Sequence, residues 1–308
     1  MIVTHNSAEV LGSCLDALSW VAPKTETLLI DNASVDGTLE QAEGRARRFP
    51  MARIIANDSN RGFAGAVNQG FRDSAAECVL LLNPDVEIQD GLEPLEEDCG
   101  RYGLSAGMLT DSEGRPQSGF SLRRLPTPAA LSLELLGLNR LFPSNSVNRR
   151  YRCFDLDLSS PQFAEQPAGA FLMIRRDVWS KLGGFDEQFY PVWFEDVDFC
   201  RRALEQGFTI RYNPAVRALH RGGHSVNRLD GGSRVRFWYV SLLKYAAKHF
   251  TTIGYRSVCL AAGLSTLPRM VAGMIRQRSF APVTLYLEIL QLAGKRLLSA
   301  PRPMENLG

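Results

Sequence analysis

The chain has 308 residues, of which 45% are hydrophobic and 22% charged, the composition of an ordinary soluble protein with one large core and an additional segment. The net charge is +2, but residues 233–308 contain eleven Lys and Arg against two Asp and Glu, whereas residues 1–232 contain twenty-four against thirty-one. A basic C-terminal part predicts an anionic partner, and its apolar character favours a membrane and argues against nucleic acid.

The cysteine spacing and the N-terminal sequence indicate in which cellular compartment the protein works. The six cysteines are scattered without CxxC spacing, so we expect neither a zinc site nor a disulfide framework. Residues 1–6 lack the basic and apolar regions of a signal peptide. The longest uncharged stretch of the C-terminal part, 257–268, is shorter than the roughly 20 residues of a spanning helix. We therefore expect a cytoplasmic protein with peripheral contact to the inner membrane.

Short apolar strands alternate with amphipathic helices in the first 102 residues. We expect strands at 2–3, 27–30, 53–56 and 78–82, and helices at 7–18, 39–49, 62–75 and 91–102. The run 78–82 is typical of a central parallel strand. This order predicts an α/β fold with a doubly wound sheet whose ligand lies at the carboxyl ends of the strands.

The order is less regular after residue 102. We expect strands at 119–124 and 170–174, a helix near 129–138 within a polar excursion over 125–166, and a helix at 199–206. An aromatic and basic stretch at 234–250 is followed by expected apolar helices at 254–275 and 283–298. These last helices either pack on the rest of the protein, form a dimer interface, or lie in a membrane interface; the one-sided basic excess favours the membrane.

Two acids follow predicted strands. Asp31 begins a turn, where capping chemistry is the plain explanation, but a carboxylate at the strand tip can also accept the N–H of a pyrimidine base. Asp85 follows the strand at 78–82, with Pro84 fixing the turn. Hard divalent cations favour carboxylates together with substrate phosphates, so Asp85 is a candidate metal ligand and Glu87 a weaker one.

The segment 60–70 reads as a helix start rich in small residues. Gly65 and Ala66 suit close packing of a helix on a sheet, whereas Arg61 and Gly62 suit the approach of a nucleotide or phosphate. The segment is not a GxGxxG fingerprint and does not indicate NAD.

Three acids crowd residues 195–198. Acids in a first helical turn interact favourably with the helix dipole, and Asp198 can pair with Arg202 four residues later. Because a third acid exceeds these structural needs, we assign Asp196 to proton abstraction and Glu195 to substrate support.

Two histidines flank a Gly-Gly turn near residue 222. Imidazole can complete a Mn²⁺ or Mg²⁺ site, and Arg221 can hold a phosphate through two hydrogen bonds. We favour His220 as functional and leave His224 open.

Taken in order, these segments resemble the family 2 glycosyltransferases, and specifically the rhamnosyltransferase-like enzymes of bacterial surface-polysaccharide assembly. The resemblance covers about residues 1–230 and is carried by the motifs at 3–7, 31–37, 60–64, 82–85, 183–187 and 195–198. It implies a GT-A fold, which is Rossmann-like with a mostly parallel sheet, here with a C-terminal helical extension. It also implies a nucleoside-diphosphate sugar donor, a divalent cation (Mg²⁺ or Mn²⁺) and inversion at the anomeric carbon.

The resemblance also implies roles for individual residues. Thr4 and Asp31 would contact the base, Asp85 would be the metal-binding acid, Asp196 the catalytic base, and His220 would assist the metal or diphosphate. Asn83 stands where a strict DxD motif has its first acid and could contact ribose instead, and the first strand at Met1-Ile2 is short for the family. The remaining candidates for nucleotide or substrate contact are Asn6, Asn32, Arg61, Gly62, Asn68, Asn83, Asp198 and Arg221.

We therefore expect a catalytic domain over 1–232, with a nucleotide-sugar half at about 1–110 and an acceptor half at about 111–232, followed by a basic helical tail over 233–308. The expected reaction moves a sugar, rhamnose from dTDP-rhamnose by resemblance, to a glycan or polyprenyl-diphosphate-linked acceptor. The sequence does not decide whether the protein forms a homo-oligomer.

Two other classes of protein compete with this expectation. A nucleotidyltransferase would carry a Gly-rich basic loop after the first strand, but residues 5–9 contain neither glycine nor a Lys or Arg. A non-catalytic carbohydrate-binding protein would not need Asp85 and Asp196 together.

Overall fold

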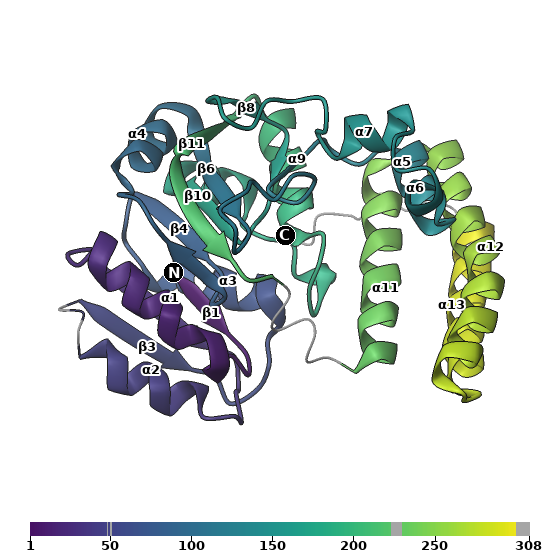
Figure 1. The fold of residues 1–308 in the computed structure, drawn as a ribbon, viewed down its shortest axis with the longest axis horizontal. Helices are drawn as coiled ribbons and strands as arrows, with labels where there is room; N and C mark the ends of the chain where they lie inside the picture. Colours follow the sequence, from purple (N-terminus) through teal and green to yellow (C-terminus); the bar gives the residue numbers. More distant parts are fainter. Residues whose placement is uncertain (48, 50, 223–229, 300–308) are drawn as a thin grey trace. The chain divides into compact units, whose positions relative to one another are not determined.

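The computed structural model describes residues 1–47, 49, 51–222 and 230–299, which fall into two compact units (Figure 1). The first comprises the described parts of Met1–Arg124 and Arg152–Leu229, and the second those of Leu125–Tyr151 and Asp230–Gly308. The second unit thus starts its main segment close to the expected boundary at 232. It also includes residues 125–151, which the sequence placed in the acceptor half.

The first unit is built on a nine-stranded sheet, ordered β3-β2-β1-β4-β10-β6-β11-β5, with β8 paired to β11. Strands β10, β5 and β8 run antiparallel to their neighbours and the remaining pairings are parallel, which confirms the expected mostly parallel sheet. The strands are β1 (Ile2–Thr4), β2 (Thr27–Asp31), β3 (Ala52–Ala56), β4 (Cys78–Leu82), β5 (Val86–Ile88), β6 (Gly103–Thr110), β8 (Gln162–Ala164), β10 (Phe171–Arg175) and β11 (Thr209–His220).

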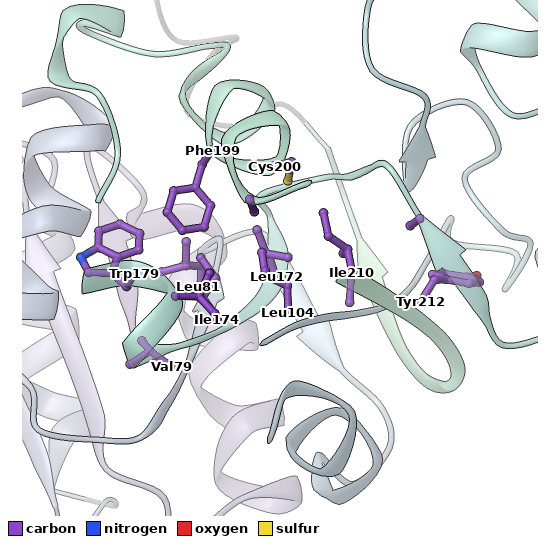
Figure 2. Packing of buried hydrophobic residues seen from close by; sticks show 14 of the residues in the cluster. Val79, Leu81, Leu104, Leu172, Ile174, Trp179, Phe199, Cys200, Ile210 and Tyr212 are labelled. Atoms are coloured by element: carbon purple, nitrogen blue, oxygen red, sulfur yellow. The ribbon is translucent and has the colours of Figure 1, made fainter. Parts of the chain in front are cut away.

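Helices pack on both faces of this sheet, so its central strands are apolar on both sides. Leu80 and Leu82 of β4 pack in the cluster with α1 and α4, whereas Val79 and Leu81 pack in the opposite cluster with α3, α8 and α9. Figure 2 shows this second cluster, in which Trp179 and Phe199 lie over the strand residues. The helices are α1 (Ala8–Val21), α2 (Thr38–Ala46), α3 (Gly62–Asp73), α4 (Glu93–Tyr102), α8 (Arg176–Leu182), α9 (Glu195–Glu205) and the short 3-10 helix η1 (Glu187–Phe189).

Three expectations for the first unit need correction. The strand expected at 119–124 is reduced to β7 (Leu122–Arg123), which pairs with β9 (Gln166–Pro167) outside the main sheet. Helix α9 begins at Glu195 rather than at 199, because its acids occupy the first turn, where the helix dipole favours negative charge. The pattern also missed β5, β6 and the twelve-residue β11, which completes the sheet.

The second unit is helical. Side chains cap three of its helices: Thr127 before α5, Asp230 before α11 and Thr251 before α12. Arg269 of α12 donates from Nη2 to the carbonyl oxygen of Leu135 at 2.7 Å, which ties the excursion to the tail helices. The helices are α5 (Pro128–Leu135), α6 (Leu138–Leu141), α7 (Ser146–Tyr151), α11 (Gly231–His249), α12 (Thr252–Gln277) and α13 (Ala281–Leu298).

Helix α12 corrects the expectation that the tail has no segment long enough to span a membrane. It has 26 residues with a mean hydropathy of 1.5 in its most apolar window, and a third of that window is buried within the protein. By length and composition α12 could therefore cross a bilayer, although the core helix of a globular protein can have the same properties.

Candidate active site

Thr4 and Asp31 lie side by side at the carboxyl ends of β1 and β2, as the sequence predicts. The Thr4 hydroxyl donates to Asp31 Oδ1 at 2.9 Å. Ser34 donates to the same carboxylate twice, from its backbone N–H to Oδ2 at 2.9 Å and from its hydroxyl to Oδ1 at 2.5 Å. The Asp31 carboxylate is therefore a buried acceptor with a fixed orientation, and its contact with a base stays a prediction.

Asn32 and Asn6 build the backbone around this edge. Asn32 Oδ1 accepts from the backbone N–H of Arg61 at 2.9 Å, and its Nδ2 donates to Asn60 Oδ1 at 2.8 Å. Asn6 Oδ1 accepts from the backbone N–H of Val35 at 2.9 Å. Both amides thus hold loops in place, so their contact with a nucleotide or substrate stays a prediction.

Gly62 and Asn68 connect helix α3 to the segment that precedes α9. Gly62 has a φ of 74°, and a Cβ there would lie 2.8 Å from Tyr190 Cδ2, so only glycine suits this position. Asn68 donates from Nδ2 to the carbonyl oxygen of Phe185 at 2.9 Å and accepts from its N–H at 2.9 Å. The structure therefore uses Asn68 to hold the 185–187 segment, while Arg61 is exposed at the start of α3.

Asp85 and His220 meet where β4 ends and β11 ends. Their side chains are 6% and 4% exposed, and His220 Nε2 lies 3.7 Å from Asp85 Oδ2. Burial lowers the pKa of His220, which keeps the imidazole neutral and able to act as a ligand, while the nearby Asp85 works in the opposite direction. The other ring nitrogen, Nδ1, is 2.8 Å from Gln117 Oε1.

These two side chains fit part of a cation site. A neutral imidazole and a carboxylate are suitable ligands for Mn²⁺ or Mg²⁺, and here their nearest atoms, His220 Nε2 and Asp85 Oδ2, lie 3.7 Å apart. Across residues 1–299, leaving aside 48, 50 and 223–229, no group of three His, Cys, Asp or Glu side chains is arranged to hold a metal. Such an ion would therefore need further ligands from the substrate.

Some residues next to Asp85 and His220 already make hydrogen bonds or ion pairs within the protein. Glu87, the weaker metal candidate, accepts from Arg221 Nε at 2.7 Å, and the Arg221 backbone N–H donates to the carbonyl oxygen of Asp85 at 3.1 Å. Arg221 thus lies beside the cation site with its side chain largely exposed. The backbone of Asn83 is held by Ala170, and its side chain is partly accessible. His224 lies outside the described residues.

The two residues that precede α9 have a strained backbone conformation. Trp193 and Phe194 both have positive φ, at 77° and 73°, a conformation that is costly for bulky residues and tends to occur at functional sites. This turn places Glu195 and Asp196 in the first turn of the helix. Glu195 is 4% exposed and, within the described chain, its Oε2 is a buried atom without a hydrogen-bond partner. Burial, with the Asp196 charge adding to it, raises the pKa of Glu195 well above its usual value.

Asp196 has the environment of a general base. Removal of its carboxyl from water raises its pKa, although two backbone N–H groups oppose this by donating to it, Gly169 to Oδ2 at 2.9 Å and Val197 to Oδ1 at 2.8 Å. The positive charge of Arg123 also lowers the pKa. A carboxylate with a raised pKa and a fixed orientation suits proton abstraction from a hydroxyl.

Asp198 does not share this environment. Its side chain is fully buried, and Oδ2 accepts from Arg202 Nε at 2.7 Å. Arg202 also donates to the carbonyl oxygens of Leu182 and Gly184 at 2.7 and 2.8 Å. The structure thus favours the ion-pair alternative for Asp198 over substrate binding.

The pair Asp85–His220 and the carboxylate of Asp196 are connected by two adjacent residues. The carbonyl oxygen of Ala170 accepts from the backbone N–H of Asn83 at 3.0 Å, and the N–H of Gly169 donates to Asp196. A Cβ on Gly169 would lie 2.9 Å from Asp196 Cβ, so this close approach depends on glycine. Asn83 is two residues before Asp85, and so both halves of the site are built on the segment 169–170.

Sequence reasoning missed Gln117, Gly169 and Arg123. Gln117 contacts His220, Gly169 contacts Asp196, and Arg123 lies close enough to Asp196 to affect its pKa. A single glutamine, glycine or arginine has no motif around it that would mark it. The sequence did predict strands at 119–124 and 170–174, next to these residues. A predicted strand does not show which distant side chains its neighbouring residues contact.

The fold is of the GT-A type, a mostly parallel sheet flanked by helices, with Asp85 and His220 at its carboxyl edge and Asp196 connected to them through the segment 169–170. The family model "Glycosyl transferase family 2" matches residues 1–106. Over this part the chain is similar to the family 2 glycosyltransferases, and the relatives below are similar to it over a longer stretch.

Two relatives and one solved structure illustrate the similarity. The N-acetylglucosaminyl-diphospho-decaprenol L-rhamnosyltransferase of Mycobacterium tuberculosis is 28% identical over 73% of this chain and 76% of its own length. The rhamnosyltransferase WbbL of Escherichia coli is 26% identical over 59% of this chain and 66% of its own length. The mannosyltransferase PcManGT of Pyrobaculum calidifontis, solved with GDP-Man and Mn²⁺, has a TM-score of 0.53 and 14% identity, covering 96% of this chain and 85% of that one. This last likeness concerns the fold alone.

Proposed function

We propose that this enzyme transfers rhamnose from dTDP-rhamnose, with inversion, to a hydroxyl of a polyprenyl-diphosphate-linked glycan in cell-envelope polysaccharide synthesis. The observation that carries this proposal is the connection of a cation site, Asp85 with His220, to a desolvated carboxylate, Asp196, through the segment 169–170. The names of the relatives supply the sugar and the kind of acceptor.

In this proposal Asp196 is the general base. A sugar hydroxyl is a poor nucleophile, so the carboxylate accepts its proton as the oxygen attacks the anomeric carbon. The N–H groups of Gly169 and Val197 hold the carboxylate oxygens in place. The attack and the loss of the nucleoside diphosphate occur in one displacement on opposite sides of the carbon, which inverts it.

The remaining residues hold the donor. Asp85 and His220 would bind a divalent cation, which when bound neutralises the charge that develops on the leaving diphosphate. Thr4 and Asp31 would bind the base at the strand edge, and the exposed Arg221 would contact a phosphate. Burial raises the pKa of Glu195, which favours its neutral form, and in that form it would support the substrate as a hydrogen-bond donor.

A donor screen tests this proposal. Purified protein is mixed with dTDP-, UDP- and GDP-sugars, with Mn²⁺, Mg²⁺ or chelator, and release of nucleoside diphosphate is followed with and without a polyprenyl-diphosphate-linked glycan. We expect metal-dependent release from dTDP-rhamnose. Asp85→Ala and Asp196→Ala should abolish transfer, with Asp196→Ala still binding the donor. Transfer by Asp196→Asn would refute the assignment of the base.

We further propose that helix α12 brings the enzyme to the cytoplasmic face of the membrane that holds this acceptor. Its exposed apolar residues are spaced by seven, four, three, four and four positions, which puts them on one face over about 33 Å at 1.5 Å per residue. Lys and Arg outnumber Asp and Glu by ten to two in residues 230–299, which suits anionic lipid. The residues of this face are Ile253, Leu260, Leu264, Leu267, Val271 and Ile275.

Vesicle sedimentation tests the membrane proposal. The protein should bind vesicles that contain phosphatidylglycerol more strongly than vesicles of phosphatidylcholine alone. Leu264→Glu with Leu267→Glu should release it, whereas Leu141→Glu, at a leucine of α6 that is 70% exposed, should not. Equal sedimentation of the double variant and the wild type would show that this face does not contact lipid.

A further inference from the structure

Gln117 is the polar side chain that contacts His220 from the opposite side to Asp85. Its backbone is firmly held, since its N–H donates to the carbonyl oxygen of Leu109 at 2.9 Å and its own carbonyl accepts from the N–H of Ser121 at 2.9 Å. Its side chain makes two contacts with one residue: Nε2 donates to the carbonyl oxygen of His220 at 2.7 Å, and Oε1 lies 2.8 Å from His220 Nδ1.

These two contacts determine which nitrogen of His220 carries the proton. A backbone carbonyl can only accept, so the Gln117 group that faces it must be the NH₂. The amide oxygen, which can only accept, therefore faces Nδ1, and Nδ1 must carry a hydrogen. In the neutral ring, Nε2 then keeps its lone pair, and this lone pair is on the side of Asp85.

The position of His220 Nε2 next to Asp85 suits a pair of cation ligands. An unprotonated Nε2 placed 3.7 Å from a carboxylate oxygen brings two electron-rich atoms together. A divalent cation bound by both would turn this repulsion into attraction. The ring is also restrained by Phe120, which stacks on it with ring centroids 4.8 Å apart and an angle of 17°.

We propose that Gln117 is a positioning residue of the cation site, which holds His220 as the Nδ1–H tautomer with Nε2 directed at the ion shared with Asp85. This inference rests on the proposed function, because the ion belongs to the donor complex. Partners that orient a metal-bound histidine in this way commonly change metal affinity by about 10- to 100-fold when they are removed.

The first experiment reads the tautomer without any metal. Nitrogen-15 NMR of the metal-free protein distinguishes a protonated from an unprotonated ring nitrogen, and comparison with His220→Ala identifies the signal of His220 among the four histidines. We expect Nδ1 protonated in the wild type, and loss of this preference in Gln117→Leu. An Nε2–H tautomer in the wild type would overturn the proposal, whatever the enzyme's activity.

The second experiment measures Mn²⁺ binding by electron paramagnetic resonance, in the presence of saturating dTDP, with UDP and GDP in parallel. Gln117→Leu should weaken binding by about 10- to 100-fold. Gln206→Leu, at an exposed glutamine at the end of α9, is the matched control and should bind as the wild type does. Thermal unfolding of each variant without metal confirms that it is folded.

A double-mutant cycle separates positioning from a general structural effect. If Gln117 acts through His220, then Gln117→Leu should cause no additional loss of Mn²⁺ affinity in the His220→Ala background. An equal loss in both backgrounds, or wild-type affinity in Gln117→Leu, would overturn the proposal. Absence of Mn²⁺ binding by the wild type with all three nucleotides would instead refute the metal-dependent donor site, and with it the role of Gln117 there, while the tautomer result would still stand.

Discussion

Replacing Asp198 by alanine should destabilise the fold while leaving the carboxylate of Asp196, the proposed base, in place. Asp198 is fully buried and its partner Arg202 is 19% exposed, so the variant would leave a largely buried guanidinium with two carbonyl contacts but no opposite charge from Asp198. Breaking a buried pair in this way costs about 3–5 kcal/mol. Since the whole stability of a domain is about 5–15 kcal/mol, this is a large fraction of it.

The same helix offers a matched control. Arg201 and Glu205 form an ion pair at 2.8 Å with the same four-residue spacing, but their side chains are 24% and 52% exposed. Glu205→Ala should therefore cost no more than about 1 kcal/mol. Because each kcal/mol shifts Tm by about 2–4 °C in a domain of this size, Asp198→Ala should melt on the order of 10 °C lower and Glu205→Ala close to the wild type.

Urea unfolding followed by tryptophan fluorescence measures this difference. Trp179 is a suitable reporter, because its ring packs 5.2 Å from that of Phe199, next to Asp198 in α9. Nucleotide binding is titrated in parallel below the unfolding transition. If Asp198→Ala kept wild-type stability but lost nucleotide affinity, the structural assignment would be refuted and Asp198 would be a substrate ligand, as the sequence suggested.

Three further predictions concern the base and its neighbours. Gly169→Ala should displace Asp196, because its Cβ would lie 2.9 Å from that of Asp196; we expect kcat to fall by about 100-fold with donor affinity unchanged in a nucleotide titration. The kcat/KM profile should lose activity as the pH falls through the raised pKa of Asp196, above the value of about 3.9 for an ordinary aspartate; an acid limb at or below 3.9 would contradict the burial argument. Burial raises the pKa of Glu195 above its unfolded value of about 4.3, so its contribution to stability is full below that pH and is lost as the pH rises through the folded pKa. Glu195→Gln should therefore gain stability over the wild type with rising pH in urea unfolding, and parallel curves would count against an unpaired buried carboxyl.

The sequence alone was sufficient to place the candidate site residues that follow parallel strands. Asp31 and Asp85 could be placed because strand ends in a doubly wound sheet meet at one edge, and the structure puts them at the ends of β2 and β4. Periodicity alone could not reveal that β10 enters the sheet antiparallel between β4 and β6. It therefore could not show that Gly169 would meet Asp196.

The sequence also could not separate ligands from structural polar groups. Asn68 and Asp198 have the same chemical character as Asn83 and Asp196, but the structure engages the first two with Phe185 and Arg202. The partner of a polar side chain depends on a residue that can be more than a hundred positions away in the chain. Gln117 and His220 are such a case, separated by 103 positions.

The segment 169–170 has a consequence for how such an enzyme can change its substrate. The N–H of Gly169 donates to Asp196, and the carbonyl oxygen of Ala170 accepts from Asn83, two residues before Asp85, so the proposed base and the proposed metal ligand are both tied to two adjacent residues. An inserted residue between them would be expected to break one of these two hydrogen bonds, whereas a longer loop elsewhere would leave both in place. We therefore expect a change of sugar or acceptor to involve residues outside the segment 169–170.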